Sequence, residues 1–136
     1  MEDNKNILVE WNEDFEICPS IDKQHRKLID IINRLFDALN RGKAREILNE
    51  IIFELKDYTV YHFSTEEKMF EEKNYVEKDI HKKQHEFFIK KVEEFEQRFK
   101  SEDIYLLFDV AHFIRDWICD HILISDKKYK HLCSEK

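Results

Sequence analysis

The sequence contains very few residues that break helices. Among its 136 residues there is one glycine and one proline. A turn-rich all-β fold needs many more of both, so their scarcity favours long helices. Hydrophobic residues make up 42% of the chain and charged residues 39%, which is typical of a globular protein and not of a disordered one. The length is enough for one domain with a buried core and too short for two.

Three further absences exclude classes of function. No apolar run is long enough to span a bilayer, so we expect no membrane insertion. The formal net charge is -7 and the lysines are mixed with acidic residues, so the chain lacks the basic face that nucleic acid binding requires. The first residues, MEDNKN, do not form a signal peptide, and we expect a cytoplasmic protein.

The chain is also poor in cysteine. Cys18, Cys119 and Cys133 form no closely spaced pair, and their number is odd. In the absence of a secretion signal, this favours reduced thiols. We expect Cys18 and Cys119 to pack as small apolar groups.

A repeating apolar stripe is the strongest positive feature of the sequence. Apolar residues recur at alternating steps of three and four, which is the period of a helix with one buried face. Short connections between such helices predict an all-α fold, an up-down-up-down antiparallel four-helix bundle. We expect one domain, 1–136, made of an N-terminal arm at 1–19, helices at about 20–40, 43–70, 77–100 and 103–124, and a short helical tail at 126–136.

The stripe carries histidines and a carboxylate at one end of the bundle. In the second helix it runs from Leu55 onto His62 and Glu66, which lie four residues apart on one helical face. A buried charge is costly unless it is paired or binds a metal. In this topology the first and third helices begin where the second and fourth end. The histidines of the stripe all lie at that end: His25, His62, His81, His85 and His121.

A second carboxylate follows His121 by five residues. Five residues turn an ideal helix by roughly 140°, so Asp126 can point inward only if the helix ends or widens there. The five imidazoles and two carboxylates exceed the needs of one ion. If both carboxylates bridge two octahedral ions together with an oxo or hydroxo group, one coordination position stays open. Imidazole with carboxylate suits iron, whereas zinc more often takes four ligands.

Two histidines are expected to lie outside this set. His112 lies off the stripe of the fourth helix, and His131 has no partner at helical spacing. Each part of the pattern is common by itself, since a pair such as His81 and His85 also occurs on solvated helices. A single buried histidine is more often an ordinary core residue. The metal-site prediction therefore depends on the convergence of all the parts.

These residues resemble the hemerythrin family, most closely its single-domain bacterial members. The matching segments are VEWNEDF in the arm, IDKQH, HFSTEEKMF, HKKQHEFF and WICDHILISD, in the order of the family and across nearly the whole chain. The chain has Cys18 where bacterial members often have glycine, and Val76 where they often have proline. The resemblance implies a non-haem di-iron centre that binds dioxygen reversibly.

The resemblance also implies a distribution of the ligands over two irons. The two carboxylates would bridge the irons together with an oxo or hydroxo group. One iron would have three histidines, and the other would have two and an open position for O2. In this scheme the bridges are Glu66 and Asp126, the first iron is held by His81, His85 and His121, and the second by His25 and His62.

We expect a dry apolar pocket around the open position. Water or free anions would promote loss of superoxide and oxidation of the irons, so their exclusion protects reversible binding. Tyr129 is placed to hydrogen-bond the centre from outside. The expected lining of the pocket is Leu28, Phe63, Trp117, Ile118, Ile122 and Leu123.

The expected function is storage, transport or delivery of O2, without enzymatic activity. The alternatives are a di-iron enzyme that acts on O2, peroxide or nitric oxide, and an O2 sensor. Ferritin-like oxidases use a carboxylate-rich shell with a Glu-x-x-His motif, which this sequence lacks. The histidine-rich set therefore favours reversible binding, and the sequence identifies no protein partner.

Overall fold

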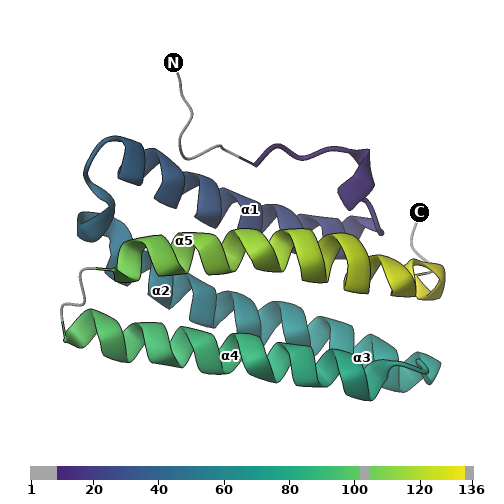
Figure 1. The fold of residues 1–136 in the computed structure, drawn as a ribbon. Helices are drawn as coiled ribbons and strands as arrows, with labels where there is room; N and C mark the ends of the chain where they lie inside the picture. Colours follow the sequence, from purple (N-terminus) through teal and green to yellow (C-terminus); the bar gives the residue numbers. More distant parts are fainter. Residues whose placement is uncertain (1–8, 102–104, 134–136) are drawn as a thin grey trace.

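Four long antiparallel helical rods form the bundle that the sequence predicts (Figure 1). The computed structural model describes residues 9–101 and 105–133. These residues contain no β-strand, so the all-α fold class is confirmed. The rods in chain order are α1 (Pro19–Asn40), then α2, η2 and α3 (Ala44–Tyr58, Thr59–Phe63 and Ser64–Lys73), then α4 (Lys78–Lys100), and finally α5 and η3 (Leu106–Asp116 and Trp117–Ser125).

The boundaries of the second and fourth rods differ from the predicted ones. The second continues to Lys73, beyond its predicted end near residue 70, and closes on Asn74 in a left-handed conformation with φ of 52°. The fourth begins at Leu106, and residues 102–104 at its predicted start lie outside the described residues. The tail forms a 3-10 helix, η4 (Asp126–Leu132), while 1–8 of the arm and 134–136 of the tail also lie outside the described residues.

The only glycine of the chain closes α1. Gly42 has φ of 71°, a left-handed backbone conformation that residues other than glycine adopt only at an energetic cost. Its N–H donates to the carbonyl of Leu39, and the N–H of Lys43 donates to the carbonyl of Ala38. These two bonds form a Schellman motif, which ends the helix within a few residues and lets α2 return along α1.

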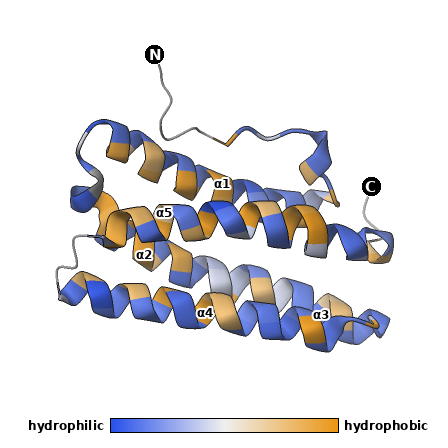
Figure 2. Cartoon of the chain, in the orientation of Figure 1, coloured by the Kyte–Doolittle hydropathy of each residue, from blue (hydrophilic) through white to orange (hydrophobic). Residues whose placement is uncertain are grey.

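Each rod turns its apolar stripe toward the others. Helix α1 packs against α2 and α5, and α4 packs against the same two. In Figure 2 the apolar residues lie largely where the rods face one another, and hydrophilic residues cover most of the outer faces. Burial of one Leu or Ile side chain contributes roughly 1.5–3 kcal/mol. The shared core holds the bundle together, and its fully buried members include Ile31, Ile32, Leu35, Leu48, Ile51, Leu55, Val110 and Ile114.

The N-terminal arm runs antiparallel to α1 and packs along it (Figure 1). Val9 exchanges two hydrogen bonds of 2.7 Å with the side chain of Asn33. The guanidinium of Arg26 lies over the ring of Trp11, 4.2 Å from its centroid. The short 3-10 helix η1 (Glu13–Phe15) then places Phe15 in the core.

A second apolar cluster closes the end of the bundle where α1 begins. Cys18 and Cys133 form a disulfide there, with Cα atoms 6.3 Å apart, so the prediction of reduced thiols is wrong for this pair. The two residues lie 115 positions apart and meet only because the tail folds back onto the start of α1. Cys119 is exposed, so the prediction that it packs as an apolar group is also wrong. The buried members of the cluster are Ile17, Cys18, Ile21, Phe70, Tyr75 and Tyr129.

The disulfide bears on the expected location of the protein. Disulfides persist in oxidising compartments, so the cysteines give no support to the cytoplasmic prediction. Among the described helices, none combines the length and the apolar character needed to cross a bilayer.

Removal of the Cys18–Cys133 disulfide is expected to destabilise the bundle. The bond closes a loop across 115 positions, so replacing Cys18→Ser and Cys133→Ser together should lower the free energy of unfolding by about 2–4 kcal/mol. Denaturant unfolding with and without a thiol reductant measures the effect. Cys119→Ser is the matched control, because this thiol is free and exposed. A wild-type chain that is equally stable with and without reductant would contradict the bond.

Candidate metal centre

The five predicted histidines and both carboxylates meet at one end of the bundle core. Each of the seven residues is at most 4% exposed. The two histidines that the sequence excluded, His112 and His131, are exposed and lie outside the cluster. The cluster draws on every rod: His25 comes from α1, His62 from η2, Glu66 from α3, His81 and His85 from α4, His121 from η3, and Asp126 from the first residue of η4.

Widened helical segments carry two of the histidines. Both η2 and η3 are π-helical, so their hydrogen bonds reach five residues back instead of four. At the end of η3 the N–H of Asp126 donates to the carbonyl of His121, five residues earlier. This wider turn places His121 and Asp126 on the same side of the rod. The sequence analysis predicted that Asp126 can point inward only if the helix ends or widens at this point. Such π turns within helices are frequent at functional sites.

The donor atoms form two groups that share Glu66. Its Oε1 lies 2.9 Å from His85 Nε2, while its Oε2 lies 3.3 Å from His62 Nε2. One oxygen of the carboxylate thus faces each group, as in a bridging ligand. Within each group the donor atoms lie within 4.8 Å of one another; the groups are Glu66, His81, His85 and His121, and His25, His62, Glu66 and Asp126.

Asp126, the first residue of η4, is arranged in the same way. Its Oδ1 lies 2.7 Å from His81 Nε2 and 3.0 Å from His121 Nε2. Its Oδ2 lies 2.9 Å from His25 Nε2. Both carboxylates therefore have one oxygen directed toward the three-histidine group and the other toward the two-histidine group.

Hydrogen bonding does not account for these close approaches. The nitrogens and oxygens lie 2.7–3.7 Å apart, yet several of them have no hydrogen-bond partner. A buried polar atom without a partner costs roughly 1–3 kcal/mol. Cations between the two groups would satisfy all of them, and the nitrogen and oxygen donors fit iron but not an iron–sulfur cluster. The atoms without partners include Glu66 Oε1, His81 Nε2, His85 Nε2, His121 Nε2 and both oxygens of Asp126.

Two side chains that the sequence analysis missed accept hydrogen bonds from the outer ring nitrogens of two of the histidines. His62 Nδ1 donates to Gln24 Oε1 over 2.5 Å, and His85 Nδ1 donates to Glu67 Oε2 over 2.8 Å. These bonds leave Nε2 of each ring free to face the centre. Helical spacing could not have found them, because each bond joins two different helices. Tyr129, which the sequence did predict, donates to Glu66 Oε2.

Aromatic rings enclose the centre on the side of the bundle core. The residues expected to line a pocket are buried, apart from the partly buried Leu123. On the opposite side Phe70 and Tyr129 belong to the cluster that closes the end of the bundle. Three histidine rings stack on aromatic neighbours: His62 on Tyr58 with centroids 5.0 Å apart, His85 on Phe63 at 3.8 Å, and His121 on Trp117 at 3.9 Å.

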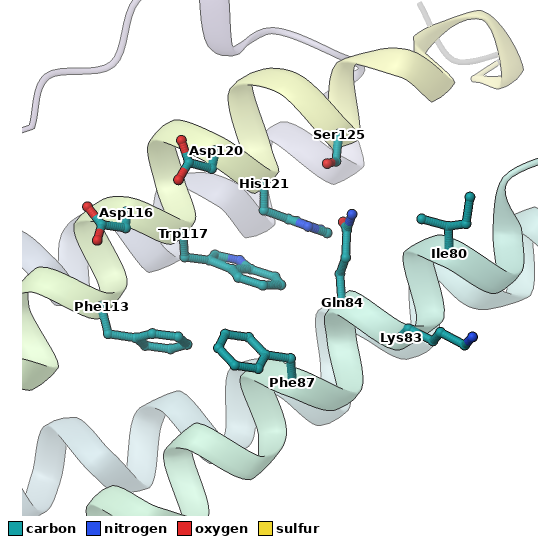
Figure 3. A pocket seen from close by; sticks show the side chains of 10 residues that line it. All are labelled: Ile80, Lys83, Gln84, Phe87, Phe113, Asp116, Trp117, Asp120, His121 and Ser125. Carbon is teal, nitrogen blue, oxygen red and sulfur yellow. The ribbon is translucent and has the colours of Figure 1, made fainter.

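Two surface cavities reach the edge of the centre. The larger, of about 590 Å³, lies between α4 and the fourth rod. Figure 3 shows Trp117 and His121 pointing across it toward Gln84 and Phe87 of α4. The other, of about 430 Å³, lies between α1 and the second rod and is lined in part by Tyr58 and His62. The two cavities thus each border one histidine of the centre, His121 in the three-histidine group and His62 in the two-histidine group.

The interactions between the acids and the histidines compete with burial. Burial raises the pKa of Glu66, but His62 and two further histidines outweigh it and hold this pKa well below its ordinary value. Burial lowers the pKa of His62 and of His121. It also acts to lower the pKa of His81, but the close carboxylates of Asp126 and Glu66 outweigh it and raise this pKa to about 9.

Mild acid is expected to destabilise the metal-free chain. Because the pKa of His62 is lowered in the folded state, unfolding takes up a proton below its ordinary value of 6.5, and stability falls there. Glu66 acts in the same sense below 4.5, since the stability that its lowered pKa contributes is complete above that value and is lost progressively as the pH falls below it. The contribution of His81 is complete below 6.5 and is lost only as the pH rises through about 9. Thermal melting should therefore give a falling midpoint from pH 6.5 to 4.5, and a constant midpoint would contradict these shifts.

Several known proteins are similar in sequence to this chain over most of its length. The family model described as "Hemerythrin HHE cation binding domain" matches residues 18–133. A bacteriohemerythrin of Pseudomonas aeruginosa (strain LESB58) is 36% identical over 131 residues, which cover 92% of this chain and 84% of that protein. For a bacteriohemerythrin of Clostridium acetobutylicum the identity is 36%, covering 88% of this chain and 96% of the relative. A hemerythrin-like protein of Naegleria gruberi is 32% identical, covering 88% and 89%. The chain belongs to the hemerythrin family.

Proposed function

We propose that this chain is a non-haem di-iron protein that binds dioxygen reversibly. The observation that carries the proposal is the pair of buried donor groups joined by two carboxylates, in a member of the hemerythrin family. The family model names cation binding, and the donor set suits iron. Two bound irons would supply the electrons that hold O2 reversibly.

The proposed ligand set follows the two donor groups. Glu66 and Asp126 would hold both ions, as their oxygens are directed to both groups. The group with two histidines has one nitrogen donor fewer, so its ion keeps a coordination position open for O2. We assign one ion to His81, His85 and His121 and the other to His25 and His62, with an oxo or hydroxo group as third bridge.

The residues around the centre have two tasks in this proposal. Gln24 and Glu67 orient His62 and His85 through their outer nitrogens. The apolar and aromatic side chains exclude water from the open position, which slows oxidation of the irons. Their burial supports this role for the proposed lining, which is Leu28, Phe63, Trp117, Ile118, Ile122 and Leu123.

Storage or delivery of O2 is the role that the donor set supports best. Di-iron oxidases of the ferritin type use a carboxylate-rich set, with a Glu from each of two helices and a Glu-x-x-His motif from each of two others. Here five of the seven donors are imidazoles. We therefore propose a binding protein and not an enzyme.

Iron content tests the ligand set. The wild-type protein, supplied with iron during expression, should carry about two irons per chain by elemental analysis. His62→Ala and His121→Ala each remove a donor from one group, so each should lose at least about one iron. His112→Ala, at an exposed position, should retain both. Equal losses in all three variants would refute the assignment.

Oxygen binding tests the function itself. When O2 is added to the reduced, iron-loaded protein in a stopped-flow instrument, a new visible absorption should form. It should disappear when argon removes the O2, and return over repeated cycles. Rapid consumption of O2 with release of peroxide or water would instead identify an oxidase.

A further inference from the structure

One buried tyrosine in the wall around the centre has a hydroxyl whose hydrogen finds no acceptor among the described residues. Tyr58 is 5% exposed, and its Oη is buried without a bond. By contrast, Tyr129 on the other side of the centre donates to Glu66. Buried hydroxyls are nearly always paired with protein, water or a ligand, and a phenylalanine ring would fill the space without the unsatisfied group. The indole N–H of Trp117 interacts with this hydroxyl but can only donate. The hydroxyl hydrogen of Tyr58 therefore requires an acceptor that the described residues do not supply.

The ring of Tyr58 lies against the two-histidine group. It precedes His62 by one helical turn and stacks on it, with an angle of 23° between the rings. His62 Nε2 in turn lies 3.1 Å from His25 Nε2. In the three-histidine group, His85 stacks instead on Phe63 and His121 on Trp117. Tyr58 is thus the aromatic neighbour of the group for which an open coordination position is proposed.

The smaller cavity leads to the same place. Its lining includes two buried residues, Tyr58 and His62. Two exposed lysines, Lys23 and Lys27, and one acid, Asp57, also line it. The excess of positive charge favours the approach of small anions.

We propose that Tyr58 donates its hydroxyl hydrogen to the small ligand that occupies the open position beside His25 and His62. This inference rests on the proposed function and deepens it, because it names a hydroxyl donor beside the open position. A hydrogen bond is strongest to an acceptor that carries negative charge. Tyr58 therefore selects ligands whose outer atom accepts a hydrogen bond.

Azide binding to the oxidised, iron-loaded protein tests this role. Azide is a small anion whose terminal nitrogen accepts a hydrogen bond, and titration followed by visible absorption gives its dissociation constant. Tyr58→Phe keeps the ring and removes only the hydroxyl, so the constant should rise about tenfold, equivalent to roughly 1.4 kcal/mol. The matched control is Tyr61→Phe, at an exposed tyrosine of the same rod, which should leave the constant within about twofold of wild type.

The metal-free chain supplies a readout that does not depend on iron. Tyr58→Phe removes a hydroxyl whose hydrogen has no acceptor among the described residues, so the melting temperature should stay the same or rise. Tyr129→Phe removes a hydroxyl that is bonded to Glu66, and its melting temperature should fall by about 3 °C. A clear fall for Tyr58→Phe would show that its hydroxyl is satisfied within the protein, which overturns the proposal.

The outcomes separate this proposal from the proposed function. A wild-type chain that binds no iron would overturn the function and the role of Tyr58 with it. A wild-type chain that binds two irons and azide, with an unchanged azide constant in Tyr58→Phe, would overturn the role of Tyr58 alone.

Discussion

The burial of two carboxylates among five imidazoles is the constraint on which the rest of the structure depends. Glu66 and Asp126 are fully buried, and three of their four oxygens lie close to ring nitrogens without a hydrogen-bond partner among the described residues. Charges removed from water in this way are tolerated when they are paired or bind metal. The arrangement of the carboxylates, with one oxygen toward each histidine group, matches two cations better than a network of ion pairs.

The two ends of the bundle differ in what their buried side chains do. The end away from the centre is an ordinary packed core, and it can hold the helices in register whether or not metal is bound. At the other end the buried stripe changes from aliphatic to polar side chains, and local features of the backbone and a disulfide position one of them, Asp126. The turns of η3 and η4 carry Asp126 inward, and the Cys18–Cys133 disulfide fastens the tail that follows it. The tail thereby supplies one carboxylate of the cluster, Asp126, and supports the other, Glu66, through the hydrogen bond from Tyr129.

Much of the fold and of the candidate site could be predicted because helical spacing is a local property. The interval of four between His62 and Glu66 places both on one face, and the topology gathers the stripe histidines at one end. The inward turn of Asp126 could be stated only as a condition, because a π turn depends on tertiary packing more than on local residue type. The partner of Cys18 and the hydrogen bond from His62 to Gln24 could not be predicted. Each depends on how two distant segments lie against each other, which no spacing encodes.

The central claim is that two metal ions lie between the carboxylates of Glu66 and Asp126. Diffraction from crystals of the iron-loaded chain, recorded on both sides of the iron absorption edge, tests it most directly. Two anomalous peaks are expected, roughly 3.5–4 Å apart, one beside His25 and His62 and the other beside the three remaining histidines. A single peak, or iron bound elsewhere on the chain, would contradict the claim.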